Sequence, residues 1–393
     1  QAFGIINLRI DGESFDFSIP RRENRIGVGH KDFLVECDPS MSFQDAASRR
    51  DFTVNAIGFD LASNAVVDPF NGVADIQKKI LRPTSEAFKE DALRVLRAMQ
   101  FAARFDFNGT DDLCIMTRAM IKDFDALPVE RLWGEWEKWA LKGKFPSSGL
   151  IQLERCGWLK LFSEINDLFG IPQDKEWHPE GDALWHTMLV CDAAAEIAER
   201  EQLDDFERCV LMFAALCHDM GKVSCTVFKD GRWRSPGHAQ AGVPIANIFL
   251  LSIGCPKDIR ENVLPLVAEH MAHCGMEVNK RNLRRLALRL GVANIEQLLR
   301  LIEADMSGRP PLPKGLPVEC VAMRELAKDL SISKAGPQAI IMGRHLIGMQ
   351  VKPGPEMGLM LKDAFEAQLN GEFDTLEGGL NWICNHYTRE MVL

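Results

Sequence analysis

Strict alternation of apolar and polar residues is confined to the start of the chain, in residues 3–23 (FGIINLRIDGESFDFSIPRRE). A period of two is typical of β-strands, and the central Asp-Gly pair is a common two-residue hairpin turn. In the second strand the alternation places Phe15, Phe17 and Ile19 on one face and Asp16 on the other. We therefore expect a two-stranded hairpin near the amino terminus.

Helical periodicity dominates the rest of the chain. Apolar residues recur at three- and four-residue spacing in residues 90–105 (EDALRVLRAMQFAARF), 182–198 (DALWHTMLVCDAAAEIA) and 295–309 (IEQLLRLIEADMSGR). A nearly uninterrupted apolar run in residues 209–222 (CVLMFAALCHDMGK) predicts a further helix that is buried on all sides and stops at a glycine. The predicted fold class is α+β and mostly helical, with a mixed sheet at the amino terminus.

Composition limits the class of protein. With 393 residues, 46% of them hydrophobic, the chain can bury two or three cores. No apolar run approaches the ~20 residues that a membrane span needs. Pro and Gly cluster in residues 171–181 and 308–317, which predicts linkers there. The eleven cysteines show no CxxC spacing, which predicts reduced core residues of a soluble, cytoplasmic protein.

The formal net charge of −10 argues against indiscriminate binding of nucleic acid, because neutralising phosphates requires clustered Lys and Arg. Residues 279–290 (NKRNLRRLALRL) nevertheless carry five cationic side chains on one amphipathic helix. Two interpretations stay open for this helix, a track for RNA phosphates and an ordinary solvated face.

The segment RRDFTVNA (residues 49–56) combines cationic and polar side chains ahead of a strand-like run. Arg49 and Arg50 offer forked donors for phosphate, and Asp51 and Asn55 offer contacts to a ribose or to the backbone. The alternative is a capped entry into a strand with solvated arginines. A turn follows in DPFNGVADI (residues 68–76), between a strand and a helix.

Glu90, Asp91 and Arg94 are predicted to stand on one side of a helix, at the spacing that brings side chains together. An Asp and an Arg held in this way can read a base edge, because the carboxylate accepts from an exocyclic amine while the guanidinium donates to the neighbouring ring nitrogen. Cytosine and adenine fit this pattern, and uracil and guanine present the reverse. The alternative is a surface ion pair worth well under ~1 kcal/mol.

Six of the nine histidines fall within about a quarter of the chain, an enrichment that metal ligation would explain. His186 shares an apolar helical stripe, His218 and Asp219 end the buried helix, and Asp305 lies on the apolar face of residues 295–309. Taken singly, each is more often a hydrogen-bonded core residue. Four inward-facing residues of these types together favour a metal site. The six histidines are His178, His186, His218, His238, His270 and His273, of which His273 is expected at the surface.

The amino-terminal motifs RRDFTVNAIGFD, DPFNGVADI and EDALRVLRAMQFAARF, in this order and spacing, resemble the class II tRNA nucleotidyltransferase and poly(A) polymerase family, which includes the CCA-adding enzymes. PVERLWGEWEKWALKGK (residues 128–144) is similar to the neck helix of that family around Arg131. The resemblance implies that Asp91 and Arg94 read the incoming base and that Arg50 and Asp51 contact the triphosphate and sugar. The residues that it assigns to nucleotide binding are Arg50, Asp51, Asn55, Asp91, Arg94, Arg97 and Arg131.

The chain departs from the family pattern in one respect. The family opens with a Gly-Gly turn and a DxD pair that binds Mg²⁺ for nucleotidyl transfer, and neither precedes Arg49. We therefore expect that the front of the nucleotidyltransferase domain is missing from this chain. Asp16 stands where some members carry a third, catalytic carboxylate; the alternative is a solvent-facing strand residue. Asp16 alone would not assemble a two-metal site.

His186, His218-Asp219 and Asp305 resemble the ligand set of the HD phosphohydrolase superfamily, and WHPEGD around His178 is similar to the opening of HD domains fused to CCA-adding enzymes. The resemblance implies one or two divalent ions (Mg, Mn, Ni or Co), with His218 and Asp219 central to catalysis. It leaves His238 and His270 as ligands of a second metal or as phosphate contacts. Lys222 and Arg309 are further candidates for phosphate.

Together the resemblances imply a bifunctional enzyme that adds nucleotides from CTP and ATP to a tRNA or other RNA 3′ end and hydrolyses phosphate esters at RNA ends in its HD domain. The alternative is an HD phosphohydrolase whose remnant head only binds nucleotide or tRNA. A non-enzymatic RNA-binding scaffold is a third option, and homo-oligomerisation and the product (CCA, a single A or poly(A)) stay open. The expected regions are a truncated head (1–72), a helical neck (73–165), the HD domain (178–310) and a helical tail (311–393).

Overall fold

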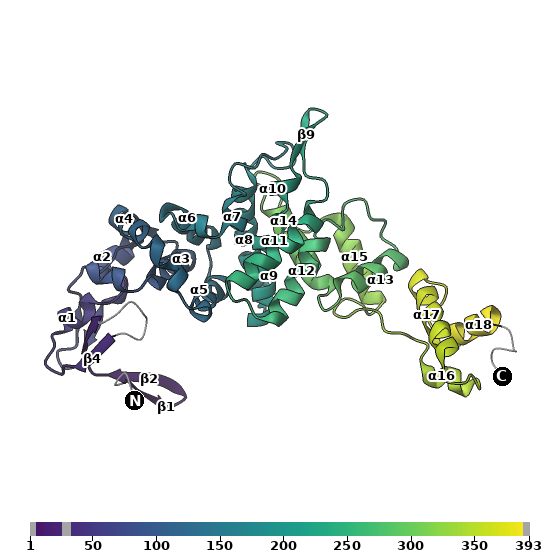
Figure 1. Ribbon diagram of the computed structural model, residues 1–393, viewed down its shortest axis with the longest axis horizontal. Helices are drawn as coiled ribbons and strands as arrows, with labels where there is room; N and C mark the ends of the chain where they lie inside the picture. Colours follow the sequence, from purple (N-terminus) through teal and green to yellow (C-terminus); the bar gives the residue numbers. More distant parts are fainter. Residues whose placement is uncertain (1–4, 26–32, 388–393) are drawn as a thin grey trace. The chain divides into compact units, whose positions relative to one another are not determined.

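The computed structural model describes residues 5–25 and 33–387 and divides into two compact units, residues 1–162 and residues 163–393 (Figure 1). Helices dominate both units, and every described sheet has only two strands. The prediction of a mostly helical α+β chain with small sheets near its amino terminus is confirmed. None of the described helices is long and apolar enough to cross a membrane. All eleven cysteines are free thiols; seven are buried, whereas Cys37, Cys274 and Cys384 are exposed and so are not the core residues that were expected.

The strands of the first unit pair two by two. The predicted hairpin is present, with β1 and β2 joined by a turn at Asp11 and Gly12, which both have a positive φ. Ile6 and Leu8 of β1 share one face with Phe17 and Phe15 of β2, their partners in the register. The strands of this unit are β1 (Ile5–Ile10), β2 (Glu13–Ser18), β3 (Arg21–Arg25), β4 (Phe33–Cys37), β5 (Gly58–Asp60), β6 (Ala65–Val67), β7 (Ile80–Leu81) and β8 (Asn108–Gly109).

The helical part of the first unit is built around α3 (Leu93–Phe105), which packs against α5 (Val129–Lys142) and α6 (Pro146–Arg155). Trp136 and Trp139 of α5 are fully buried. The other helices are α1 (Phe43–Ser48), α2 (Gly72–Gln77) and α4 (Asp111–Ala119), with 3₁₀ turns η1 (Thr53–Asn55), η2 (Glu86–Glu90), η3 (Ile121–Ala126) and η4 (Leu159–Leu161).

Two boundaries in this unit differ from the sequence prediction. The helix predicted from Glu90 begins at Leu93, because Glu90 ends a 3₁₀ turn and Asp91 is extended, with its carboxylate accepting the Leu93 backbone N–H at 3.1 Å. Glu90, Asp91 and Arg94 therefore do not share one face of a single helix. Likewise, the strand-like run after residue 53 first forms a 3₁₀ turn and becomes a strand only at Gly58.

The second unit packs α8 (Ala183–Arg200) against α9 (Asp205–Cys217) and α14 (Ile295–Ser307), and α12 (Lys257–Glu269) against α9 and α11 (His238–Ser252). A short hairpin, β9 (Val227–Lys229) and β10 (Arg232–Arg234), projects from these helices (Figure 1). The remaining helices of this body are α7 (Ser163–Asn166), α10 (Lys222–Cys225), α13 (Lys280–Leu290) and α15 (Val318–Asp329).

Two glycines allow the helices to approach closely enough to assemble the site described below. A Cβ atom on Gly221 would lie 2.1 Å from the carbonyl oxygen of His238, where α10 meets the start of α11. A Cβ atom on Gly308, at the end of α14, would lie 2.6 Å from a methyl carbon of Val190 on α8. Only a residue without a side chain fits at either contact.

The carboxy-terminal helices α16 (Gly343–Gly348), α17 (Pro355–Asn370) and α18 (Leu376–His386) form a small core of their own. Four of the five cations on α13 are ion-paired with carboxylates: Lys280 and Arg284 with Asp374, Arg285 with Glu366, and Arg289 with Glu269. Three protein carboxylates thus pair with these four cations, which favours the solvated face over a track for RNA phosphates.

Candidate metal centre and nucleotide site

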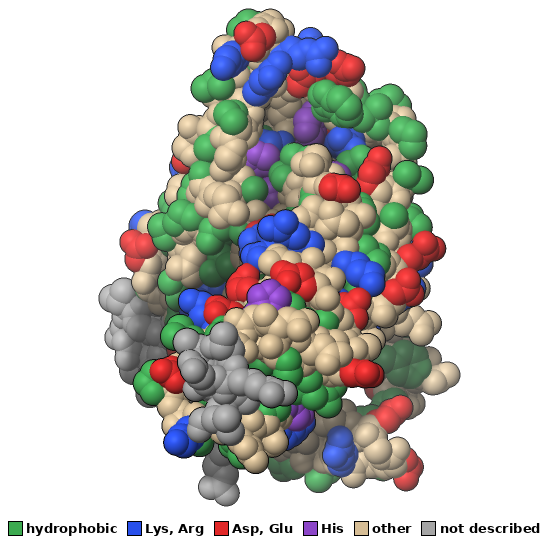
Figure 2. All heavy atoms as spheres, turned by 90° about the vertical axis from the view of Figure 1, so that its right-hand side faces the viewer, with side chains coloured by type: hydrophobic (Ala, Val, Ile, Leu, Met, Phe, Trp, Pro, Cys, Tyr) green, Lys and Arg blue, Asp and Glu red, His purple; other side chains and the backbone are tan. Residues whose placement is uncertain are grey.

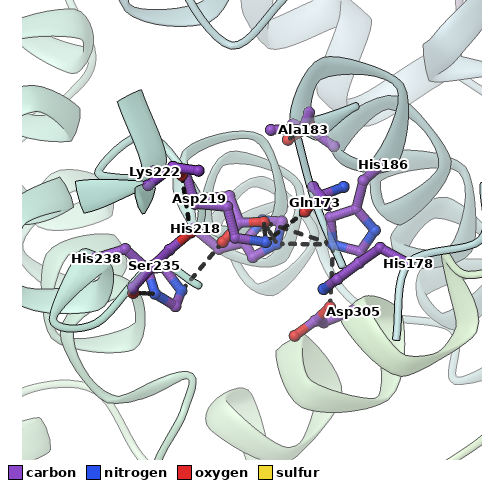
Figure 3. A network of polar contacts seen from close by, with 12 residues as sticks. Gln173, His178, Ala183, His186, His218, Asp219, Lys222, Ser235, His238 and Asp305 are labelled. Atoms are coloured by element: carbon purple, nitrogen blue, oxygen red, sulfur yellow. Dashed lines mark hydrogen bonds and ion pairs between the residues drawn. The ribbon is translucent and has the colours of Figure 1, made fainter. Parts of the chain in front are cut away.

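The ends of five helices in the second unit bring histidines and aspartates to one point. Asp219 directly follows His218, and both lie just beyond the last turn of α9 (Figure 3). The other members are His186 on α8, His238 at the first position of α11, His270 directly after α12, and Asp305 in the last turns of α14. The structure thus brings together the four residues that the sequence pattern singled out, and adds the two histidines left there as further ligands.

The side chains of this cluster are buried, and burying their charges without a counter-charge would cost folding free energy. His186, His218 and His270 are fully buried, and Asp219 is 1% exposed. An ionised carboxylate in such surroundings must be paired or must coordinate a metal. The cluster therefore requires cations, which the imidazoles can supply as bound protons or which a metal ion can supply.

Three of the imidazoles have a fixed tautomer. The Nδ1 atoms of His218, His238 and His270 each donate to the backbone carbonyl three residues earlier, at 2.8, 2.7 and 2.7 Å. Because a carbonyl oxygen can only accept, each Nδ1 carries a hydrogen, and in the neutral ring Nε2 keeps a lone pair. This is the tautomer that binds a metal ion through Nε2.

His186 is oriented by a carboxylate. Its Nδ1 lies 2.8 Å from Oε1 of Glu180, whose side chain is fully buried and whose Oε1 also lies 2.9 Å from Nδ1 of His178. The Nε2 of His186 then faces Oδ1 of Asp305 at 3.1 Å and Nε2 of His218 at 3.3 Å. Two facing ring nitrogens at this distance either share a proton in an N–H···N hydrogen bond or both bind one metal ion.

The ligand atoms form two groups, His186–His218–Asp305 and Asp219–His238–His270, each with its atoms within 4.8 Å of one another. Asp219 connects the groups, because its Oδ2 lies 3.2 Å from Nε2 of His218 and its Oδ1 lies 3.2 Å from Nε2 of His238. Imidazole and carboxylate ligands at this spacing fit divalent ions. The HD cluster, as we call these six residues, is therefore suited to binding divalent metal.

The charges of the site follow from these contacts. Burial disfavours the imidazolium form of His186, but the Asp305 and Glu180 carboxylates outweigh burial and raise its pKa to about 9. Burial and neighbouring His218 lower the pKa of His270 to about 3. Burial opposes ionisation of Asp219, yet His218 and Lys222 hold its pKa well below the usual value. The carboxylates are thus ionised and attract a cation.

Lys222, predicted as a possible phosphate contact, is ion-paired with the cluster through Asp219. Its Nζ lies 2.6 Å from Oδ2 of Asp219 and 2.6 Å from Oε1 of Gln173. Gln173 and Glu180 were not anticipated, since both lie in a Pro- and Gly-rich segment that predicted a linker. The one signal was the position of Glu180, two residues after His178.

A cavity of about 680 Å³ opens beside the HD cluster. Asp219, His238, His270 and Asp305 contribute to its wall. His273, expected at the surface, is half-buried and also lines this cavity. Histidine side chains are visible among hydrophobic and basic ones in the upper part of the face shown in Figure 2.

In the first unit, Asp51 is the centre of the predicted nucleotide site. Its Oδ2 accepts from Nε of Arg97 at 2.6 Å, and its Oδ1 accepts from the Asn55 side chain at 3.0 Å. Arg50 donates to the backbone carbonyl of Asn55 at 2.7 Å. The structure brings these four predicted residues together through their own hydrogen bonds.

The predicted base-reading pair is separated by other partners. Asp91 is ion-paired with Arg131 at 2.6 Å, whereas Arg94 donates to the backbone carbonyls of Arg49 and Ala87 at 2.7 and 2.6 Å. Burial lowers the pKa of the Arg94 guanidinium, although Asp51 and Asp91 favour its charge. Reading a base edge would require both side chains to exchange partners.

Asp16 is exposed on β2 and accepts from the side chain of Asn7 at 2.8 Å. Within the described residues, no group of potential metal ligands includes Asp16. Its surroundings are those of the solvent-facing alternative.

Comparison with known proteins gives matches to both units. Residues 1–82 match the family of the poly A polymerase head domain, and residues 184–304 match the HD domain family. A multifunctional CCA protein of Xanthomonas campestris pv. campestris (strain B100) is 34% identical over 344 residues, which cover 82% of this chain and 81% of the relative. The multifunctional CCA protein of Nitrosococcus oceani is 33% identical over 306 residues, which cover 76% of this chain and 72% of that relative.

Among solved structures, the Bacillus stearothermophilus CCA-adding enzyme in complex with CTP matches 98% of this chain and 81% of its own, with a TM-score of 0.64 at 20% identity. An apo form of a CCA-adding enzyme matches 98% of this chain and 78% of its own, with a TM-score of 0.58 at 16% identity. At these identities the structures show the shared fold. With the sequence relatives, they show that the chain belongs to the multifunctional CCA proteins, CCA-adding enzymes that join a poly(A) polymerase head domain to an HD domain.

Proposed function

We propose that this protein is a tRNA nucleotidyltransferase of the CCA-adding type whose HD domain is a metal-dependent phosphohydrolase acting on phosphate esters of RNA ends. The observation that carries the hydrolase is the HD cluster, in which four imidazoles and two carboxylates face one another in a buried position. The family relationship supports the proposed nucleotidyltransferase activity.

In the hydrolase, a divalent ion at the cluster would polarise a phosphate oxygen and lower the pKa of an attacking water. The protein's own residues prepare that site. The Nδ1–carbonyl hydrogen bonds hold three imidazoles in the ligand tautomer, and Glu180 orients the fourth. Lys222 and Gln173 fix Asp219, so that its two oxygens face different ligand groups.

The ligand chemistry favours a transition metal over Mg²⁺. Mg²⁺ prefers carboxylate, carbonyl and water oxygens, whereas imidazole suits ions such as Ni²⁺, Co²⁺ and, with carboxylates, Mn²⁺. We propose one of these three as the HD-domain metal, and Mg²⁺ with CTP and ATP for nucleotidyl transfer.

The hydrolase is tested by metal content and by hydrolysis of bis-p-nitrophenyl phosphate with each ion. His270→Gln should lower both, and His273→Gln is the matched control, because it lies three residues away and belongs to neither ligand group. Equal metal content in the two variants would contradict the proposed centre.

For the transferase, we propose that Asp91 and Arg94 read the base after Asp91 releases Arg131, and that Arg50, Asp51, Asn55 and Arg97 hold the sugar and triphosphate. The Asp91 and Arg131 side chains are 27% and 37% exposed, so a nucleotide can reach the pair. The first test is to incubate the protein with CTP, ATP, Mg²⁺ and a tRNA that lacks its 3′ terminus, and to measure the length of the tRNA.

One observation favours a second candidate function, in which the chain is a phosphohydrolase without nucleotidyltransferase activity. Over residues 5–25 and 33–387, the groups of potential metal ligands all lie in the second unit. Hydrolysis without tRNA extension would select this candidate for the chain, and extension would exclude it.

A further inference from the structure

Arg309 is a buried cation without a carboxylate partner. Its side chain lines the cavity beside the HD cluster, and the residue is only 8% exposed. Its contacts are the backbone carbonyl of Trp177, 3.5 Å from Nη1, and the sulfur of Met306, and its buried Nε has no hydrogen-bond acceptor. Within the described part of the chain, no ion pair involves this guanidinium.

An uncompensated guanidinium is expensive to bury, and proteins rarely keep one without a function. The carboxylate of Asp305 lines the same cavity four residues earlier, but it faces His186 at 3.1 Å. Arg309 is therefore a fixed positive charge at the edge of a metal-binding cluster, with donors that no protein anion satisfies. A phosphate oxygen is the acceptor that matches a forked guanidinium.

Aromatic side chains contribute to the wall of the same cavity. Trp233 lies on the projecting hairpin β9–β10, lines the cavity and remains 38% exposed. Its ring contacts Phe228 edge-on, with ring centroids 5.1 Å apart. Arg232 of the same hairpin is ion-paired with Glu176 at 2.9 Å, which ties the hairpin to the loop that carries Trp177. The indole face is thus held in place at the cavity while part of it stays accessible.

We infer that this cavity is a nucleoside phosphate pocket in which Arg309 donates to a non-bridging phosphate oxygen and Trp233 packs against the nucleoside. The volume of about 680 Å³ lies within the range of small-molecule sites, so the pocket holds one nucleotide. Aromatic stacking tolerates any base. The inference rests on the proposed hydrolase function and adds how its substrate is recognised.

The phosphate contact of Arg309 and the nucleoside contact of Trp233 can be tested separately, each with its own ligand. Full-length, Mn²⁺-loaded protein is titrated with orthophosphate and, separately, with adenosine, and binding is followed by ligand-observed NMR. Neither probe can be hydrolysed, so binding is measured independently of catalysis.

Arg309→Gln should weaken orthophosphate binding about 10- to 100-fold, as expected for loss of a charge-assisted hydrogen bond, and leave adenosine binding unchanged. Its matched control is Arg208→Gln, because Arg208 is equally buried, pairs with Glu199 and does not line the cavity. Orthophosphate affinity equal to that of wild type in Arg309→Gln would overturn the phosphate contact.

Trp233→Ala should weaken adenosine binding about 5- to 100-fold and leave orthophosphate binding unchanged. Val227→Ala is the matched control on the same hairpin, because Val227 does not line the cavity and, unlike Phe228, makes no ring contact with Trp233, and Trp233→Phe should restore part of the affinity. Equal adenosine affinity in Trp233→Ala and wild type would overturn the nucleoside contact.

Hydrolysis of adenosine 2′-monophosphate by the same variants separates this inference from the proposed function. Raised KM with unchanged metal content supports both. Binding of both probes without hydrolysis of any phosphate ester would reject the hydrolase and retain the pocket. Wild-type protein that binds neither probe would overturn the pocket whatever its activity.

Discussion

The two sites of this protein differ in how their functional side chains are paired. In the HD cluster, ligand atoms face one another, and backbone carbonyls and a buried glutamate hold their far sides. In the head and neck, the predicted nucleotide-binding side chains are already engaged by protein partners, as in the Asp91–Arg131 pair. The first site is preorganised for its ligand, whereas the second must break protein contacts to bind one.

This difference has an energetic consequence. A preorganised site loses little free energy to rearrangement, so the ligand gains most of the interaction. Where a nucleotide replaces an existing ion pair, only the difference between the two interactions contributes to affinity. Substitutions should therefore have large effects in the HD cluster and smaller, more variable effects in the nucleotide site.

The largest effect is expected for Asp219→Ala, which removes the residue shared by both ligand groups. Metal content and phosphohydrolase activity should fall by at least about 100-fold, since even loss of a supporting residue costs 10- to 100-fold. CTP and ATP binding, measured by calorimetry, should stay unchanged. Asp219→Asn, which keeps the shape of the side chain, separates loss of charge from loss of packing. Retained hydrolysis in both variants would remove the HD assignment.

Glu180→Gln tests whether preorganisation matters apart from direct ligation. The substitution removes the charge that orients His186 and should weaken metal binding about 10- to 100-fold, as measured by competition with a chelating dye. Asp182→Asn is the control, because asparagine can still cap α8 through the Trp185 backbone N–H. Identical metal affinities for Glu180→Gln and wild type would show that His186 needs no orienting carboxylate.

Arg94→Ala addresses the other side of the comparison. CTP and ATP affinity should fall about 10-fold, because the lost charged donor is partly offset by the carbonyl contacts that a nucleotide would have displaced. Calorimetry with each nucleotide measures this, with HD-domain hydrolysis as the internal control. Unchanged nucleotide affinity would count against a role of Arg94 in reading the base.

The HD cluster also depends on close packing between α14 and α8. Gly308→Ala would force a Cβ against Val190 and separate α14 from α8, which should lower the free energy of unfolding by about 1–3 kcal/mol and weaken metal binding through Asp305. Thermal unfolding and metal titration measure the two effects. Full metal affinity in a folded Gly308→Ala protein would show that the cluster tolerates helix movement.

The smallest effect, of opposite sign, is expected in the neck. Gly134 lies inside α5, and a Cβ there would meet no atom within 4 Å. Gly134→Ala should therefore raise the free energy of unfolding by about 0.5–1 kcal/mol, the usual gain from alanine in a helix interior. Chemical denaturation measures it, and a loss of stability would indicate a packing constraint at this position.

The sequence indicated that four members of the HD cluster face the protein interior, because each lies on or just beyond an apolar helix whose periodicity shows which side faces the core. His186 and Asp305 were located in this way. Glu180 and Gln173 could not be found by the same reasoning, because they lie in an irregular loop whose fold depends on contacts with distant helices. Composition identifies such a segment as a linker and cannot show that it folds back over a site.

In the head, local spacing was a poor guide to pairing. The spacing of Asp91 and Arg94 predicted a pair on one helix, but Asp91 is outside the helix and pairs with Arg131, forty residues away. For the same reason the sequence left both interpretations of the α13 cations open, since Asp374 and Glu366 lie far along the chain. Ion pairs between distant segments depend on tertiary structure, which periodicity does not contain.

The way helices end at the HD cluster has a further consequence. α9 and α12 end immediately before their cluster residues, and α14 ends two residues after Asp305, so three helices direct their carboxyl termini at one small volume. Aligned peptide dipoles place about half a negative charge at such an end. α8 and α11, in contrast, begin beside the cluster and direct their positive amino termini at it. Three carboxyl ends against two amino ends leave a net negative contribution from the backbone, which favours cations. A variant that has lost one carboxylate should accordingly still prefer divalent cations to monovalent ones, with reduced affinity.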